Sequence, residues 1–219
     1  MNTVAPRYDI YAFIHKGLRA FMAHTLVRVG RLDAHDPDEL AEVGTELKAL
    51  LAICRSHLAH ENEVLHTAMQ ARAPGSADKI GHEHVEHLAA IDRLEQMLAL
   101  VPGNDEAGLA LYRALGHFVG ENFDHMQREE TVHNAVLWAT HTDAELAAME
   151  RHIVANLSPQ EAQLSMRWIL PHLTPAERAE MLAGVRRDAP AEAFEGLLSL
   201  VRPLLGGRDW RKLSHALGL

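Results

Sequence analysis

The stretches that decide how this chain folds are His57-Leu-Ala-His60-Glu61 and His125-Met-Gln-Arg-Glu129-Glu130. Each of them places a histidine and a glutamate four residues apart, so in an α-helix both side chains lie on one face, about one turn apart. Two such helices that face each other bring both carboxylates to the middle of a bundle. Two cations held ~3.5–4 Å apart repel each other and need bridging carboxylates. The spacing therefore predicts a dinuclear metal site with Glu61 and Glu129 as bridges and histidines as terminal ligands.

The sequence around these motifs predicts long helices and no strands. Alanine, leucine, glutamate and arginine, all good helix formers, dominate, and no stretch alternates between apolar and polar residues. Asp36 is the expected N-cap of the second helix, with Pro37 as its first residue. Long helices joined by short loops are typical of an antiparallel up-down four-helix bundle in an all-α protein. We expect these helices over residues 9–32, 37–71, 77–100 and 105–138.

The chain changes character after Thr142, where the elements become short and carry clear capping signals. Ser158-Pro159-Gln-Glu161 and Thr174-Pro175-Ala-Glu177 both read as capping boxes with proline at the first helical position. We therefore expect a metal-binding bundle over residues 1–142 and a C-terminal extension of five short helices over residues 143–219. The apolar residues of the extension either pack on the bundle or form a contact between two copies of the chain; they include Trp168, Leu170, Leu173, Met181, Leu182, Leu197, Leu198 and Leu200.

Composition narrows the class of partner. The net charge of −9 and the pI of about 5.9 argue against a nucleic-acid partner and against docking on an anionic membrane. No apolar run reaches the ~18 residues of a membrane span, and residues 1–9 lack the features of a signal peptide. The single Cys54 fits a reducing compartment, so the expected location is the cytoplasm.

Histidines are unusually frequent, with 16 against 21 lysines and arginines, and histidine is the commonest metal ligand. His15 lies in an apolar stretch of the first helix, and the third helix offers His84 and His87, which share a face. Two His-x-x-x-Glu motifs together with one histidine on each remaining helix are a much more specific indication of a metal site than one motif alone. His82 points to another side of the third helix. The following histidines are interpreted as surface or packing residues: His24, His35, His66, His117, His133, His141, His152, His172 and His215.

Over about residues 9–140 the chain resembles the hemerythrin-like, or HHE cation-binding, family. The stretch His15-Lys-Gly-Leu18-Arg19 is similar to the first-helix motif of that family, and Glu83-His84 is similar to its third-helix motif. The two His-x-x-x-Glu stretches correspond to the second and fourth helices. The resemblance implies a di-iron centre that binds oxygen or senses iron and oxygen. It implies the ligands His15, His57, Glu61, His84, His125 and Glu129.

The sequence departs from the oxygen-carrying hemerythrins on the third helix. Those carriers have a second histidine four residues after the first, and here that position is Leu88. His87 and His60 are the alternative ligands. In the carriers the fourth-helix carboxylate lies five residues after its histidine, which makes Glu130 the alternative to Glu129. A missing fifth histidine either opens a coordination position or weakens one metal site.

Three functions remain open from the sequence. The first is a non-haem di-iron protein that binds or senses oxygen, nitric oxide or iron. The second is a di-iron enzyme that acts on peroxide or oxygen. The third is a structural zinc or mononuclear metal site. Mixed imidazole and carboxylate ligands suit iron, manganese or zinc better than calcium or magnesium.

Overall fold

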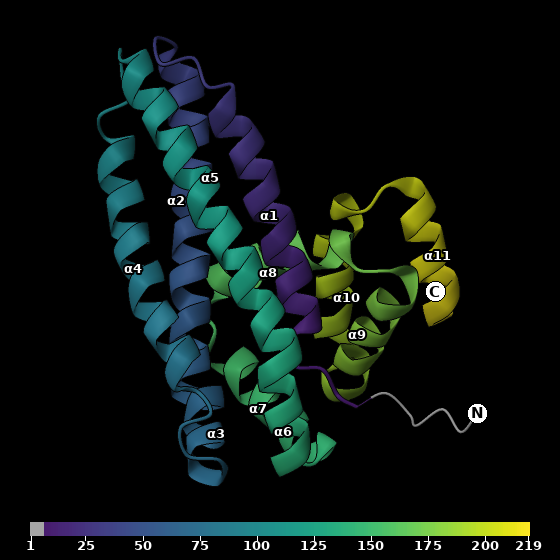
Figure 1. Cartoon of the computed structure of the whole chain (residues 1–219). Helices are drawn as coiled ribbons and strands as arrows, with labels where there is room; N and C mark the ends of the chain where they lie inside the picture. The colour runs from purple at the N-terminus through teal and green to yellow at the C-terminus, as the bar shows by residue number, and fades with distance from the viewer. Residues whose placement is uncertain (1–6) are drawn as a thin grey trace, which may run out of the picture.

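The computed structural model describes residues 7–219, and over these residues the chain is helical with no strand. The all-helical prediction is therefore confirmed. The predicted lack of a signal peptide concerns residues 1–9, and residues 1–6 lie outside the described range. Four long helices lie side by side (Figure 1), namely α1 (Ala12–Gly30), α2 (Pro37–His60), α4 (Asp78–Leu98) and α5 (Asp105–Arg128). Because α1 and α4 each pack against both α2 and α5, the four helices surround a common interior.

Two of the long helices continue through an irregular turn. After α2 the chain passes through the π-helical turn η1 (Glu61–His66) into α3 (Thr67–Arg72). After α5 it passes through the π-helical turn η2 (Glu129–His133) into α6 (Asn134–Thr140). The sequence predicted each of these segments as one uninterrupted helix. The structure corrects that prediction: the backbone stays helical, but each helix contains one wider turn.

Local capping chemistry fixes where the long helices begin. The Asp36 side chain accepts hydrogen bonds from the backbone N–H groups of Asp38 at 2.9 Å and Glu39 at 3.1 Å, and Pro37 follows it directly. Asn104 accepts a hydrogen bond from the backbone N–H of Ala107 at 3.0 Å. Such caps satisfy amide groups that have no partner inside the helix.

The interior of the bundle contains two apolar clusters with a polar layer between them. On α2 and α5, the larger cluster ends at Leu58 and Met126. The smaller cluster begins beyond the ends of these two helices, at Leu65 of η1 and Leu137 of α6. The residues between these points include both glutamates of the predicted metal site. Burial of the apolar side chains on either side therefore holds this polar layer away from water.

The C-terminal residues form short helices with the predicted caps. Thr142, Ser158 and Thr174 each form a complete capping box with the glutamate three residues later. The elements are α7 (Asp143–Asn156), α8 (Pro159–Ile169), η3 (Leu170–His172), α9 (Pro175–Asp188), α10 (Ala191–Val201), η4 (Arg202–Leu204) and α11 (Gly207–Leu217).

These short helices divide between two cores. The α8 helix lies against α1, where the Trp168 ring stacks on the Phe21 ring with 4.1 Å between centroids. The helices α9, α10 and α11 lie beside this contact and enclose an apolar cluster of their own (Figure 1). Its members include Leu170, Leu182, Phe194, Leu198, Val201, Leu205, Leu213 and Leu217. The division of the chain near residue 142 remains a prediction.

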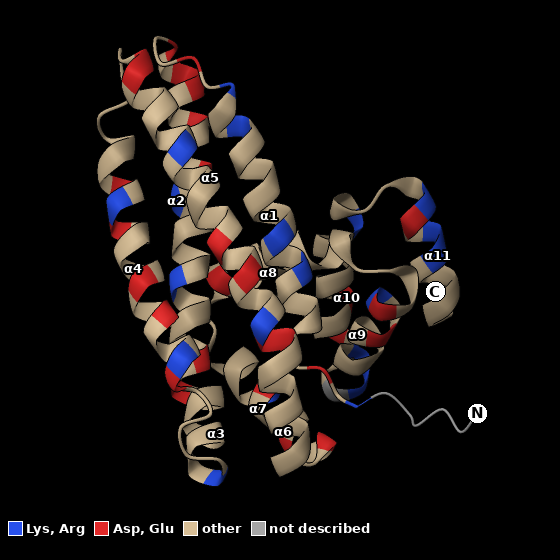
Figure 2. Cartoon of the chain, viewed as in Figure 1, with Lys and Arg blue, Asp and Glu red and all other residues tan. Residues whose placement is uncertain are grey.

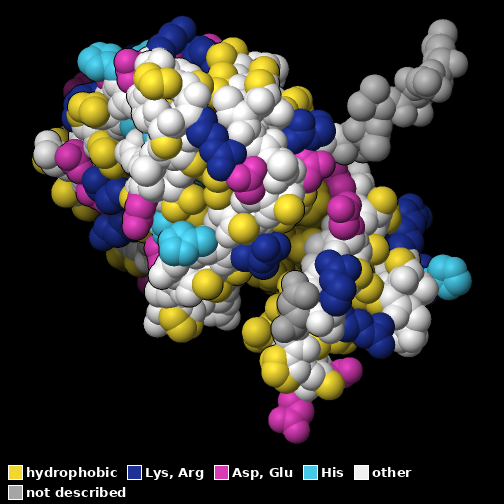
Figure 3. All heavy atoms as spheres, turned by 90° about the horizontal axis from the view of Figure 1, so that it is seen from below, with side chains coloured by type: hydrophobic (Ala, Val, Ile, Leu, Met, Phe, Trp, Pro, Cys, Tyr) yellow, Lys and Arg dark blue, Asp and Glu magenta, His cyan; other side chains and the backbone are white. Residues whose placement is uncertain are grey.

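Charges of both signs are distributed over the surface of the helices (Figure 2), and they also mix on the face seen from below (Figure 3). Among residues 7–219, no helix combines the length and the apolar character that crossing a bilayer requires.

Candidate metal centre

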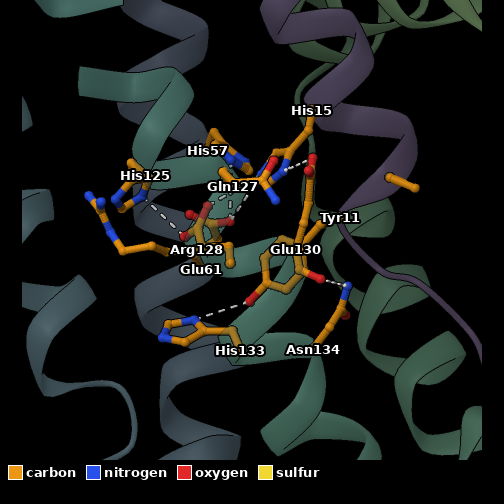
Figure 4. Close-up of polar contacts among 12 residues, drawn as sticks. Tyr11, His15, His57, Glu61, His125, Gln127, Arg128, Glu130, His133 and Asn134 are labelled. Atoms are coloured by element: carbon orange, nitrogen blue, oxygen red, sulfur yellow. Dashed lines mark hydrogen bonds and ion pairs between the residues drawn. The ribbon is translucent and has the colours of Figure 1, made fainter. Parts of the chain in front are cut away.

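Two groups of potential ligands meet in the polar layer between the apolar clusters. Within each group, the ligand atoms all lie within 4.8 Å of one another. The first group contains His15, His57, Glu61 and Glu129, and the second contains Glu61, His84, His125 and Glu129. Figure 4 shows His15, His57, Glu61 and His125 converging from α1, α2, η1 and α5. The six residues predicted as principal ligands are thus brought together, and the two glutamates belong to both groups.

The two carboxylate oxygens of Glu61 face different imidazoles. Oε1 lies 3.2 Å from His57 Nε2 and 4.0 Å from His15 Nε2. Oε2 lies 3.5 Å from His84 Nε2. One oxygen therefore serves each ligand group, as a carboxylate that bridges two cations must do.

Glu129 divides its oxygens in the same way. Oε2 lies 3.4 Å from His15 Nε2 in the first group. Oε1 lies 3.1 Å from His125 Nε2 and 3.6 Å from His84 Nε2 in the second. Each group thus offers two imidazole nitrogens and one oxygen from each glutamate. This ligand set is the same on both sides.

The polar atoms at the centre fit a bound cation because they lack other partners. Both oxygens of Glu61, both oxygens of Glu129 and the Nε2 atoms of His15 and His57 are buried without a hydrogen-bond partner. Buried carboxylates without donors are strongly disfavoured. Two cations among these atoms would satisfy them. The residues present therefore fit a dinuclear metal centre.

Burial also affects the ionisation of the two glutamates. Burial, together with the charge on Glu129, raises the pKa of Glu61 well above its usual value. Burial also acts to raise the pKa of Glu129, but the adjacent His125 and His84 imidazoles outweigh it and hold this pKa well below its usual value. Burial lowers the pKa of His57, which favours the neutral imidazole that a metal requires. A divalent cation would allow both carboxylates to ionise.

Three of the four imidazoles are oriented by hydrogen bonds at Nδ1, the ring nitrogen that faces away from the central glutamates. His15 Nδ1 lies 3.0 Å from Glu130 Oε1, and His84 Nδ1 lies 2.8 Å from Asn62 Oδ1. When Nδ1 donates to such an acceptor, Nε2 keeps its lone pair for a metal. Asn62 was not predicted, and Glu130 lies behind His15 rather than at the centre.

The third imidazole, that of His125, has a charged support. Its Nδ1 lies 3.0 Å from Glu83 Oε2, and the Arg128 guanidinium donates to the same oxygen at 2.8 Å. The histidine, the acceptor and the arginine come from two helices, so this network also ties α4 to α5. No role was predicted for Glu83, although it lies directly before His84 in the stretch that carries the resemblance.

Comparison with protein families agrees with this geometry. A family model described as the hemerythrin HHE cation-binding domain matches residues 7–137. The chain belongs to this family. No curated protein and no solved structure matches it. Membership in the hemerythrin HHE family, together with the clustered histidines and glutamates, assigns metal-cation binding to residues 7–137.

The three alternative ligands predicted for this hemerythrin HHE domain lie outside both groups. His87 is buried, but its ring packs against the His125 ring at 4.7 Å between centroids and against Phe118. His60 is only half-buried and also belongs to neither group. Glu130 is likewise absent from both groups, and it pairs with Arg19 at 3.1 Å as well as with His15.

Two histidines of the domain that were interpreted as surface or packing residues are buried beside the centre. His66 and His133 form a third group with Glu129, again with ligand atoms within 4.8 Å of one another. They end the two π-helical turns that begin with Glu61 and Glu129. A π turn includes one more residue than an α turn, so residue 66 returns to the face of residue 61. No pattern in the sequence predicted that π-helical turn.

Proposed function

We propose that this protein binds a pair of iron ions and uses them to bind or sense a small diatomic ligand, oxygen or nitric oxide, or iron itself. The observation that carries the proposal is the division of the Glu61 and Glu129 oxygens between two pairs of imidazoles. Glu61 and Glu129 would hold the two cations together, because their carboxylates would offset the repulsion between the two positive charges. The same centre is the di-iron site that the family resemblance implies.

The ligand chemistry fits iron, and the family resemblance favours iron among the metals that it fits. Imidazole nitrogen and carboxylate oxygen together suit iron, manganese and zinc, and non-haem iron sites commonly leave positions open. Each ligand group supplies four protein atoms, two from histidines and two from glutamates. Iron that takes five or six ligands would keep room for a small molecule. When bound, iron supplies reversible electron transfer to such a molecule.

The helix arrangement belongs to the same proposal. We infer that α1, α2 with α3, α4, and α5 with α6 form the antiparallel up-down bundle of the family, over residues 1–142. The ligands come from all four of these segments, so the site requires the complete bundle. Residues 143–219 would then be an extension that either supports the bundle or contacts a second copy of the chain.

Elemental analysis of protein purified without added metal, combined with an ultraviolet–visible spectrum in air, tests the proposal. We expect about two iron ions per chain and a charge-transfer band that appears with oxygen and disappears on its removal. One zinc ion per chain and no such band would contradict the di-iron proposal and support a structural site. Two manganese ions would retain the dinuclear centre but contradict iron.

An enzyme that acts on peroxide or oxygen is the second candidate. The small number of protein ligands in each group favours it, because vacant positions admit a substrate as well as a reversibly bound ligand. Addition of peroxide to the iron-loaded protein separates the two functions. Sustained peroxide consumption that is lost in His57→Ala supports an enzyme. A single stoichiometric reaction supports binding alone.

A further inference from the structure

The third ligand group lies on the α3 and α6 side of the centre, where His66 and His133 approach Glu129. The His66 ring stacks on the His84 ring with 4.8 Å between centroids, and the His133 ring meets the His66 ring edge-on at 5.3 Å. We call His66 and His133 the lower histidine pair. Neither residue is needed for the two four-ligand groups, and both are buried.

The lower histidine pair has nitrogens free for a ligand. His66 Nε2 is buried without a hydrogen-bond partner. His133 Nδ1 lies 3.4 Å from the Tyr11 hydroxyl oxygen; when Nδ1–H donates to that oxygen, Nε2 keeps its lone pair. Figure 4 shows Tyr11 and His133 on the same side of the centre. Two imidazoles and a carboxylate make a three-ligand set for a divalent transition metal with an open position.

We propose that His66, His133 and Glu129 form an entry site, which holds one divalent cation before it moves into the dinuclear centre. The proposal rests on the proposed function, because it assumes that two cations finally occupy the centre. The ligands suit the same metals as the centre itself. An ion at the entry site reaches the second ligand group by exchanging His66 for His84, whose ring lies against it, while Glu129 stays bound.

Electrostatics makes this a transient site rather than a third permanent one. Both Glu129 oxygens already face the two principal groups. Three divalent cations around two carboxylates would repel one another strongly in a buried layer, because the interaction grows with the product of the charges. An ion is therefore held by the lower histidine pair only while a principal position is empty.

Exposure supports the direction of the route. His66 is 7% exposed, whereas His133 and His84 are each 1% exposed and Glu129 is fully buried. A cation that arrives at His66 thus moves to progressively more buried ligands. Between the entry site and the second ligand group it exchanges one ligand at a time, so it is never left unpaired in the buried layer, where an unpaired charge is very costly.

Loading and release rates test the entry site. Full-length metal-free protein is mixed with Co²⁺ in a stopped-flow instrument, and release is then measured with excess chelator. We expect His66→Gln and His133→Gln to slow both uptake and release by about tenfold or more. The final content of two ions per chain and the Kd should stay unchanged, because a site on the route lowers the barrier in both directions.

His141→Gln, which removes a buried histidine outside all three groups, and His82→Gln, which removes an exposed one, are the controls and should load at the wild-type rate. If His66 only supports His84, His66→Gln will weaken the Kd through faster release with unchanged uptake, and the entry site is then wrong. Wild-type rates in a folded His133→Gln variant also overturn it, and this variant decides the matter if His66→Gln does not fold. Wild-type protein that binds no cation would instead contradict the proposed function.

Discussion

At the scale of single residues, a His-x-x-x-Glu motif binds metal only where both side chains face the interior. The pair His117 and Glu121 has the same spacing as His125 and Glu129, and its Nε2–Oε1 distance of 3.2 Å is almost the same as the 3.1 Å of the buried pair. Its side chains are nevertheless 76% and 49% exposed. Spacing alone therefore does not distinguish a ligand pair from a solvated one, and burial opposite a second pair does.

This contrast provides a matched test of the bridges. Glu129→Ala removes one oxygen from each ligand group, so we expect it to lose most of the bound metal. Glu121→Ala removes an exposed glutamate from the His117 pair, which has the same spacing, and we expect this variant to keep the wild-type metal content. Elemental analysis of both variants after identical purification gives the comparison. Full metal content in Glu129→Ala would show that Glu129 is not a bridge.

The sequence predicted the residues that now surround the centre because their spacing follows the α-helical repeat, and because the family resemblance named one histidine on each remaining helix. His66 could not be predicted in this way. It lies five residues after Glu61, and in a regular α-helix a side chain at that spacing points to another face. The supporting acceptors Asn62 and Glu83 were missed for another reason. Polar residues of this kind are common on exposed helix faces, and only the packed neighbour reveals their role.

At the scale of helices, the beginnings were predicted well because capping is local chemistry. Asp36 with Pro37, and the boxes at Ser158 and Thr174, act within four residues of the chain, so their signal is complete in the sequence. The π turns depend instead on packing around the centre. The widened turn places Glu61 and His66 on one face. This placement brings His66 beside residues of other helices, which a local sequence pattern does not describe.

The contact between α1 and α8 gives a prediction for one glycine. A Cβ added at Gly17 would lie 2.8 Å from Ile169 Cγ1 and 3.1 Å from the Ile169 backbone. Because backbone cannot move aside as a flexible side chain does, Gly17→Ala should lower the free energy of unfolding by about 1–3 kcal/mol. Gly120→Ala, on a helix where nothing lies within 4 Å, should raise it by up to about 1 kcal/mol. Urea unfolding of both variants measures the two effects, and an unchanged Gly17→Ala would mean that α8 does not pack closely on α1.

At the scale of the whole molecule, buried neutral histidines make the metal-free protein sensitive to acid. Burial lowers the pKa of His66 and of His87 to about 4, below the value of ~6.5 in the unfolded chain. Between these pH values the unfolded state binds more protons, so stability falls as the pH decreases from about 6.5 to 4. Each residue contributes at most about 3 kcal/mol to this loss.

Urea unfolding of metal-free protein at pH 7 and pH 5 measures the acid effect. The wild type should lose stability at pH 5, and His87→Gln should lose less. His82→Gln, which changes an exposed histidine on the same helix, should follow the wild type. Equal losses in all three proteins would show that the buried imidazoles are not responsible.

The C-terminal helices depend on one buried arginine. Arg178 is 2% exposed, and its guanidinium donates to the backbone carbonyls of Leu170 and Leu173 at 3.0 Å and of Pro171 at 3.2 Å. Arg178→Ala leaves these carbonyls without this partner, and a buried unpaired group costs about 1–3 kcal/mol. We expect the cluster formed by α9, α10 and α11 to open first on heating.

Metal content should survive this opening, because all six principal ligands lie before residue 130. Limited proteolysis of Arg178→Ala should therefore cut within residues 173–219, while the remaining fragment keeps the wild-type amount of metal. Arg211→Ala, which removes an exposed arginine of α11, serves as the control and should resist the protease. One contact could make the metal site depend on the C-terminal helices. Lys16, the residue beside His15, forms an ion pair of 2.5 Å with Glu177 of α9. Loss of metal together with the C-terminal helices would mean that this contact holds His15 in place and that the chain folds as a single unit.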